Sequence, residues 1–288
     1  MQGISRNEFE IDGNILKRYN GNKSCVIVPD GIEKIAYDCF AGNKTITSVT
    51  LPDSITVIGF SAFKSCSNLK SVNIPNGVKT INDEAFRACS SLVEITLPES
   101  LTSVGKWIFA DCTSLKEVVL PDSVKSLGYG FFAGCSALTT VKLPCNLTAL
   151  DDEIFCGCKS LSSVTIPKGI LKIGKRTFKD CVSLSGILIP ANVTSIDEGA
   201  FKGCAGASTL TLPEGLTSIG KWAFSDCSAL SEIKIPKNVS VIEMYAFAHC
   251  GSAVMYCGRK KPLFGLPKGW NKDWLGGDAV KVVWANKE

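Results

Sequence analysis

The residues best equipped for chemistry in this chain are its cysteines. The sequence holds 14 cysteines and a single histidine, His249. Nine of the cysteines recur at intervals of 23 residues, and we call them the ladder cysteines: Cys66, Cys89, Cys112, Cys135, Cys158, Cys181, Cys204, Cys227 and Cys250. Thiols in this number could form disulfides, bind zinc or serve as nucleophiles.

The regular spacing of the ladder cysteines argues against disulfides and zinc. Stacked strands hold equivalent side chains parallel at about 4.8 Å, whereas a disulfide needs facing Cβ atoms about 3.8 Å apart. The closest pair, Cys156 and Cys158, lacks Cys-x-x-Cys spacing, and no second cluster accompanies it. We therefore predict buried, free thiols that pack as small hydrophobic groups, and neither a metal nor a cofactor.

Catalytic groups are equally scarce. His249 precedes the ladder cysteine Cys250, but a Cys–His nucleophile needs an exposed, ionised thiol, so a surface histidine is expected. The acidic run 151–153 recurs as Asn-Asp-Glu at 82–84 and as Asp-Glu-Gly at 197–199. Acids of this kind suit the start of a helix. The sequence predicts no enzymatic activity.

Repetition identifies the elements that position these residues. A proline returns every 23 residues from Pro29 to Pro236, and a fixed period of this length marks a solenoid. In the unit from Pro98, the alternation of 115–120 predicts a strand that ends at the next proline. Residues 101–104 are expected to be extended on the opposite wall, and one or two helical turns should carry Phe109 and Cys112 inward.

The units need caps, because each coil buries its apolar face only against its neighbours. We predict one continuous structural domain in three parts: a hairpin cap over 1–28, ten coils over 29–258 and a Trp-rich cap over 259–288. Asp12-Gly13-Asn14 is a hairpin signal, and 279–284 is expected to form a closing strand. The run 205–207, Ala-Gly-Ala in place of a leucine-bearing segment, predicts a loose or slightly bent coil.

The recurrent pattern Leu/Ile-Pro-x-x-Val-x-x-Ile-Gly-x-x-Ala-Phe-x-x-Cys-x-x-Leu-x-x-Val resembles the BspA-type leucine-rich repeat from Pro29 to about Gly258. The resemblance implies a leucine-rich-repeat solenoid, rich in β-structure with short helices. It also implies surface proteins of host-associated bacteria and some parasitic protists that adhere to host proteins or other cells. It supplies no catalytic residues.

Composition and charge narrow the choice of partner and compartment. A net charge of +4, from 31 basic and 27 acidic residues, argues against nucleic-acid binding. No segment is long enough to span a membrane, and residues 2–8 lack the apolar core of a secretory signal. A cytoplasmic protein, export by another route and a trimmed leader all remain open, although the resemblance favours the cell surface. A monomer is expected.

Two outer surfaces are candidates for binding. Outward strand positions supply most of the candidates, and aromatic residues 8 or 9 places after each proline supply the rest: Glu94, Glu117, Val119, Lys142, Leu188, Glu232 and Lys234 on strands, with Trp107 and Trp222 on the aromatic edge. Exposed strands favour small polar residues in any case, and the aromatics could fold onto a neighbouring coil. The predicted function is a non-enzymatic protein-binding or adhesion module, possible partners including host extracellular-matrix or cell-surface proteins. The alternatives are a carbohydrate or cell-wall binder and an intracellular scaffold or effector.

Overall fold

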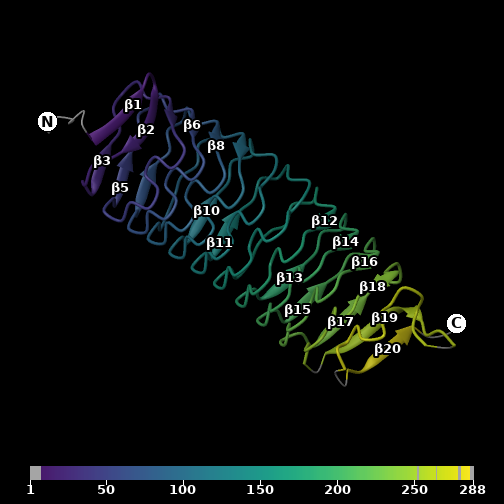
Figure 1. The fold of residues 1–288 in the computed structure, drawn as a ribbon. Coiled ribbons are helices and arrows are strands. Elements are labelled where there is room, and N and C mark those ends of the chain that lie inside the picture. The colour runs from purple at the N-terminus through teal and green to yellow at the C-terminus, as the bar shows by residue number, and fades with distance from the viewer. Residues whose placement is uncertain (1–7, 252, 264, 278–279, 286–288) are drawn as a thin grey trace. The chain divides into compact units, whose positions relative to one another are not determined.

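Parallel strands stacked one coil on the next make up this computed structural model (Figure 1). The structure describes residues 8–251, 253–263, 265–277 and 280–285. Residues 1–7, on which the argument about a leader rests, and Ala279 of the expected closing strand lie outside these ranges. The chain divides into two compact units, residues 1–144 and 145–288.

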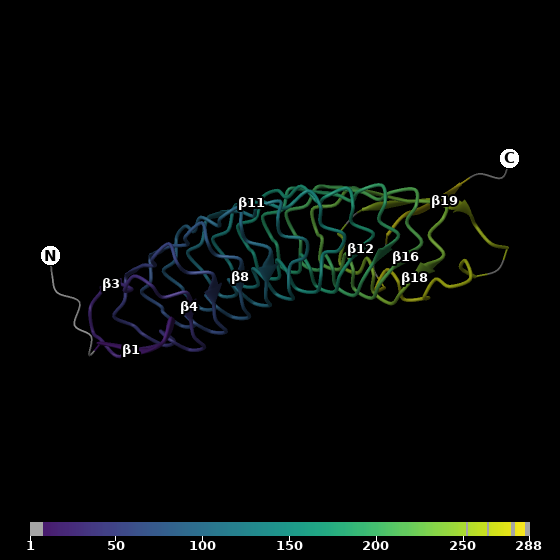
Figure 2. The same cartoon turned by 90° about the horizontal axis from the view of Figure 1, so that it is seen from above.

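The first unit is a β-solenoid with two strand-bearing walls, which lie across the coils from each other (Figure 2). Its short-strand wall is a sheet with the order β1 (Phe9–Asp12), β2 (Ile15–Tyr19), β4 (Lys34–Ile35), β6 (Val57–Ile58), β8 (Thr80–Ile81) and β9 (Ser103–Val104). Its long-strand wall contains β3 (Cys25–Ile27), β5 (Ser48–Thr50) and β7 (Ser71–Asn73) in one sheet, and β10 (Glu117–Val119) and β11 (Thr140–Lys142) in another.

The second unit repeats the arrangement. Its short-strand wall has the order β12 (Lys172–Ile173), β14 (Ser195–Ile196), β16 (Ser218–Ile219) and β18 (Val241–Ile242). Its long-strand wall consists of two sheets, one of β13 (Gly186–Leu188) and β15 (Thr209–Thr211), the other of β17 (Glu232–Ile235), β19 (Val254–Lys260) and β20 (Val282–Ala285). None of the described residues forms a helix able to cross a membrane.

The predicted solenoid of 23-residue coils is confirmed, with two corrections. The sequence predicts ten coils, whereas the structure has about 12. The additional coils lie at the ends: β2 and β3 already pair in parallel with the strands of the next coil, and β20 pairs in parallel with β19. At the N-terminal end β1 pairs antiparallel with β2 across Gly13, whose φ is +59°.

The second correction concerns the short helices, which are absent from the described residues. The segments expected to be helical are turns, in which two residues of each unit, such as Trp107 and Asp111, have positive φ. Trp107 and Asp111 donate their backbone N–H groups to Tyr129 and Ala133 of the next coil, at 2.9 and 2.7 Å. A helix would use these backbone N–H groups for hydrogen bonds within one coil. Because they bond to the next coil instead, the segment forms turns and not a helix. We call this third face the turn side.

The core of each unit is built from equivalent residues in register. Phenylalanine rings of neighbouring coils stack with centroids 4.9 Å apart for Phe40 and Phe63 and 5.1 Å apart for Phe178 and Phe201. The ladder cysteines lie beside these rings and are buried, as predicted. Each coil thus buries the same small set of side chains against its neighbour, and the surface positions are left to vary.

Candidate interaction surface

Four of the predicted binding residues come together on the long-strand wall of the first unit. Glu94 and Glu117 face each other across a parallel bridge between adjacent coils. Val119 follows on the same outward side of β10, where Lys142 of β11 is its register partner. All four side chains are exposed, and Val119, at 57%, is an apolar residue beside three charged ones. Because outward strand residues do not enter the core, these side chains are available to a partner.

The other three strand residues lie on the second unit and are divided between two sheets. Leu188 of β13 is paired with Thr211 of β15 and is 72% exposed. Glu232 and Lys234 belong to β17, where the lysine Nζ lies 3.0 Å from the glutamate Oε1. No strand pairing joins β15 to β17 within the described residues. The long-strand wall is therefore interrupted between Leu188 and this ion pair.

The two tryptophans predicted on the aromatic edge lie on the turn side and are half-buried. Trp107 packs against Tyr129 with ring centroids 4.8 Å apart, and its ring lies where a Cβ of Gly130 would be. Trp222 stacks on Tyr245 at 6.4 Å, with the ammonium of Lys221 3.9 Å from its ring centroid. Both tryptophans therefore fold onto the next coil.

Two other aromatic residues on the same edge are more accessible. Tyr37 and Phe60 are 66% and 43% exposed, and their ring centroids lie 6.1 Å apart. The sequence left two alternatives open for the aromatic edge. The two tryptophans fold onto a neighbouring coil, whereas Tyr37 and Phe60 are exposed.

The thiols of the ladder cysteines make hydrogen bonds in the core and are not placed for reaction. In eight of the nine ladder cysteines the Sγ donates a hydrogen bond to the carbonyl of the phenylalanine 26 residues earlier, for example Cys66 to Phe40 at 3.0 Å and Cys227 to Phe201 at 3.3 Å. Burial raises the pKa of the Cys66 thiol to about 12. A thiol that remains protonated at neutral pH is a poor nucleophile and a poor metal ligand.

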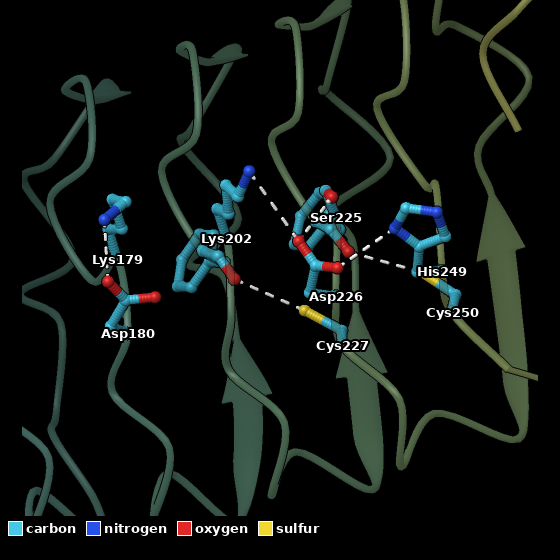
Figure 3. Close-up of polar contacts among 10 residues, drawn as sticks. Lys179, Asp180, Lys202, Ser225, Asp226, Cys227, His249 and Cys250 are labelled. Atoms are coloured by element: carbon cyan, nitrogen blue, oxygen red, sulfur yellow. Dashed lines mark hydrogen bonds and ion pairs between the residues drawn. The ribbon is translucent and has the colours of Figure 1, made fainter. Parts of the chain in front are cut away.

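His249 lies in an exposed turn, and its ring points toward Asp226 (Figure 3). Its Nδ1 lies 3.0 Å from Asp226 Oδ1, and Ser225 donates to the second oxygen of that carboxylate at 2.8 Å. The neighbouring Cys250 is buried and donates to the Phe224 carbonyl at 3.2 Å. The imidazole faces Asp226 on the surface while the thiol is used in the core, so the two do not form a nucleophile pair.

The acidic run 151–153 is also used by the turns. Asp152 accepts the backbone N–H of Lys175 at 2.7 Å, and Glu153 lies 3.3 Å from the Arg176 guanidinium. Burial, with the neighbouring Asp152 charge, raises the pKa of the Asp151 carboxyl. Within the described ranges, no three His, Cys, Asp or Glu side chains are grouped so that they could hold a metal ion.

One feature was missed by sequence reasoning. A groove of about 990 Å³ lies on the long-strand wall of the second unit, from β15 across β17 and β19 to β20. The ring of Tyr256 forms part of its lining and is 40% exposed. Tyr256 could not be found from the repeat, because the register between β17 and β19 is 22 residues, one shorter than the period.

Coils of this kind, with a phenylalanine stack beside a cysteine ladder, define a leucine-rich-repeat β-solenoid. The chain belongs to the BspA-type leucine-rich repeat family, whose model matches residues 18–139 and 131–254. This family suggests a protein-interaction module, and leucine-rich-repeat solenoids are generally non-catalytic. A search of curated proteins finds no match to the sequence.

Solved bacterial structures have the same fold. The leucine-rich repeat protein of T. pallidum is 34% identical over 64% of this chain and 91% of its own, with a TM-score of 0.59. A leucine-rich cell surface protein of Faecalibacterium prausnitzii is 23% identical over 97% of this chain and 93% of its own, with a TM-score of 0.57. The pneumococcal vaccine antigen PcpA is 20% identical over 98% and 88%, with a TM-score of 0.61. At such identities the last two show the fold alone.

Proposed function

We propose that the protein is a non-enzymatic adhesion module that binds a protein partner through its long-strand wall. The observation that carries the proposal is the set of exposed side chains formed by Glu94, Glu117, Val119 and Lys142 on adjoining coils. Family membership supports a role in protein interaction. The partner class, a host extracellular-matrix or cell-surface protein, follows from the family resemblance.

The chemistry of this set indicates what the partner presents. Like charges directly opposite each other destabilise a sheet by a fraction of a kcal/mol, and Glu94 and Glu117 are such a pair. A partner with a basic group at this point would offset the repulsion, while Val119 offers an apolar contact. The wall thus fits a protein surface with a lysine or arginine beside a small apolar patch. On the second unit, Leu188 is 72% exposed and offers an apolar contact of its own.

The test is binding of the purified protein to an array of extracellular-matrix proteins and glycans at physiological salt. Glu94→Lys combined with Glu117→Lys should abolish a saturable protein interaction. A matched control is Asp53→Lys combined with Glu99→Lys, which makes the same change of charge at exposed positions after two prolines. Equal binding by both double variants would refute the long-strand wall as the site. If the protein binds nothing on the array, the result would count against adhesion and favour an intracellular scaffold.

A further inference from the structure

The groove on the second unit lies where the long-strand wall is open. Ser218 and Val241 are paired on the short-strand wall of the same coils, so these coils are joined there. On the long-strand wall, Ile189 donates its N–H to Thr211 at 3.2 Å, but Leu212 makes no corresponding backbone bond to β17 within the described residues. The coils of β15 and β17 are therefore not joined by strand hydrogen bonds on this wall within the described residues.

The coil that contains β15 differs from the preceding coil in two respects. Leu210 and Leu212 are 9% and 8% exposed, whereas Ile187 and Ile189 of the preceding coil are each 3% exposed. Ala207, in the same coil as β15, stands where other units have leucine. The smaller side chain provides less apolar contact to hold this coil against its neighbour.

The lining of the groove combines apolar and polar side chains, and its charges balance. Two acids and two bases contribute to it, Glu214 and Glu232 with Lys234 and Lys237, so their formal charges cancel. Hydroxyl groups come from Thr209 and Thr211 of β15 and from two serines. Such a lining gives no advantage to a nucleic acid, which requires excess positive charge, or to an acidic polymer.

Trp284 and Tyr256 both line the groove. Trp284 is half-buried, and Tyr256 is the exposed aromatic ring. Tyr256 is the register partner of Lys234 on one side and of Val283 on the other, so its side chain lies on the outward face. An exposed ring beside hydroxyls, carboxylates and ammonium groups suits a ligand with apolar C–H faces and many hydroxyls. The volume, about 990 Å³, is at the upper end of ordinary ligand sites, which span about 300–1,000 Å³. It has room for several sugar rings.

We propose that this groove binds a neutral oligosaccharide, with the Tyr256 ring stacking on a sugar face and the ion pair of Glu232 and Lys234 hydrogen-bonding to its hydroxyls. The site differs from the protein-binding surface of the first unit in position and in chemistry. It also differs from the aromatic edge, whose two tryptophans are already covered by neighbouring residues.

The proposal is tested by calorimetric titration with neutral tetrasaccharides of glucose, mannose and N-acetylglucosamine, and with an acidic tetrasaccharide of galacturonic acid. At least one neutral probe should bind more tightly than the acidic one. Tyr256→Ala should weaken binding by about tenfold or more, because the stacking face is lost, whereas Tyr256→Phe should stay within about threefold. Since the ring is outward, both variants should melt like the parent protein.

A matched control is Tyr37→Ala, which removes an exposed tyrosine from the first unit and should leave binding unchanged. Trp107→Ala combined with Trp222→Ala should also leave it unchanged. The groove is ruled out as the site if no neutral probe binds, if the acidic probe binds best, or if Tyr256→Ala binds as the parent does. Loss of binding in the tryptophan variant alone would move the site to the aromatic edge.

Discussion

The Cys112 thiol donates a hydrogen bond to the backbone carbonyl of Phe86, 26 residues earlier, over 3.1 Å. Both groups are buried, and the same contact recurs between other coils of each unit. Cysteine combines a small apolar body with a weak donor, so it fills the space beside the stacked rings and satisfies a carbonyl that faces the core. This explains a cysteine repeat that forms no bridges.

Replacing Cys112 with alanine should destabilise the first unit by about 1–2 kcal/mol, because it opens a small cavity and leaves the Phe86 carbonyl with one donor, the backbone N–H of Cys89, in place of two. Urea unfolding monitored by circular dichroism measures the change. Cys25→Ala, at an exposed strand position, is the control and should have little effect. Equal stability of the two variants would show that the thiol contact contributes nothing.

Thiol reactivity should follow exposure and pKa. Hydrogen bonds from Ser48, Ser24 and Thr47 lower the pKa of the exposed Cys25 thiol, in that order of importance. Burial raises the pKa of the Cys66 thiol to about 12. Iodoacetamide at neutral pH should therefore label Cys25 well before Cys66, as read by peptide mass mapping. Ser48→Ala should slow labelling of Cys25, and unfolding in urea should remove the difference between the two thiols.

Left-handed turn residues offer a reciprocal stability test. Gly42 and Ala88 occupy the same repeat position with φ of +72° and +58°, and each donates its N–H to the next coil at 2.7 Å. A Cβ at Gly42 meets no atom within 4 Å, so Gly42→Ala adds only backbone strain and should cost about 1 kcal/mol. Ala88→Gly relieves that strain and should be neutral or stabilise by up to about 1 kcal/mol.

Thermal melting of the Gly42→Ala and Ala88→Gly variants measures these changes in stability. Ala110→Gly is the control, because Ala110 is buried and lacks a positive φ, so losing its methyl group should destabilise. A clear loss of stability in Ala88→Gly would contradict the assignment of strain to these turns.

The carboxylate of Glu84 should make stability depend on pH. The Lys64 ammonium, which donates a hydrogen bond to Glu84, lowers the pKa of the carboxyl, burial opposes this, and Arg87 at 3.0 Å reinforces it. A lowered folded-state pKa means that the ion pairs stabilise above the ordinary pKa of 4.5 and that the effect is lost as the pH falls through the folded value.

Glu84→Gln should therefore lower stability by about 0.5–1 kcal/mol at pH 7, and the difference from the parent should shrink below about pH 4. The midpoints of urea unfolding at pH 7 and below about pH 4 measure this difference in stability. Glu99→Gln, at an exposed position, is the control and should follow the parent at both. A constant difference across the pH range would exclude the carboxylate as its cause.

Several features could be predicted from one unit of sequence. The period places Leu115, Val118 and Leu120 inward and Glu117 and Val119 outward, because successive side chains of a strand point to opposite faces. The burial of the ladder cysteines follows from the same period. These features are local, since each depends only on the position of a residue within its own coil.

The sequence by itself thus determined the solenoid, its inward positions and the candidate outward rows. Only the tertiary structure decided that turns replace the expected helices, that Trp107 lies over Gly130, and that the wall opens between β15 and β17. The physical reason is the same in all three cases. Hydrogen-bond partners and gaps depend on how closely one coil approaches the next, and that distance is set by both coils together.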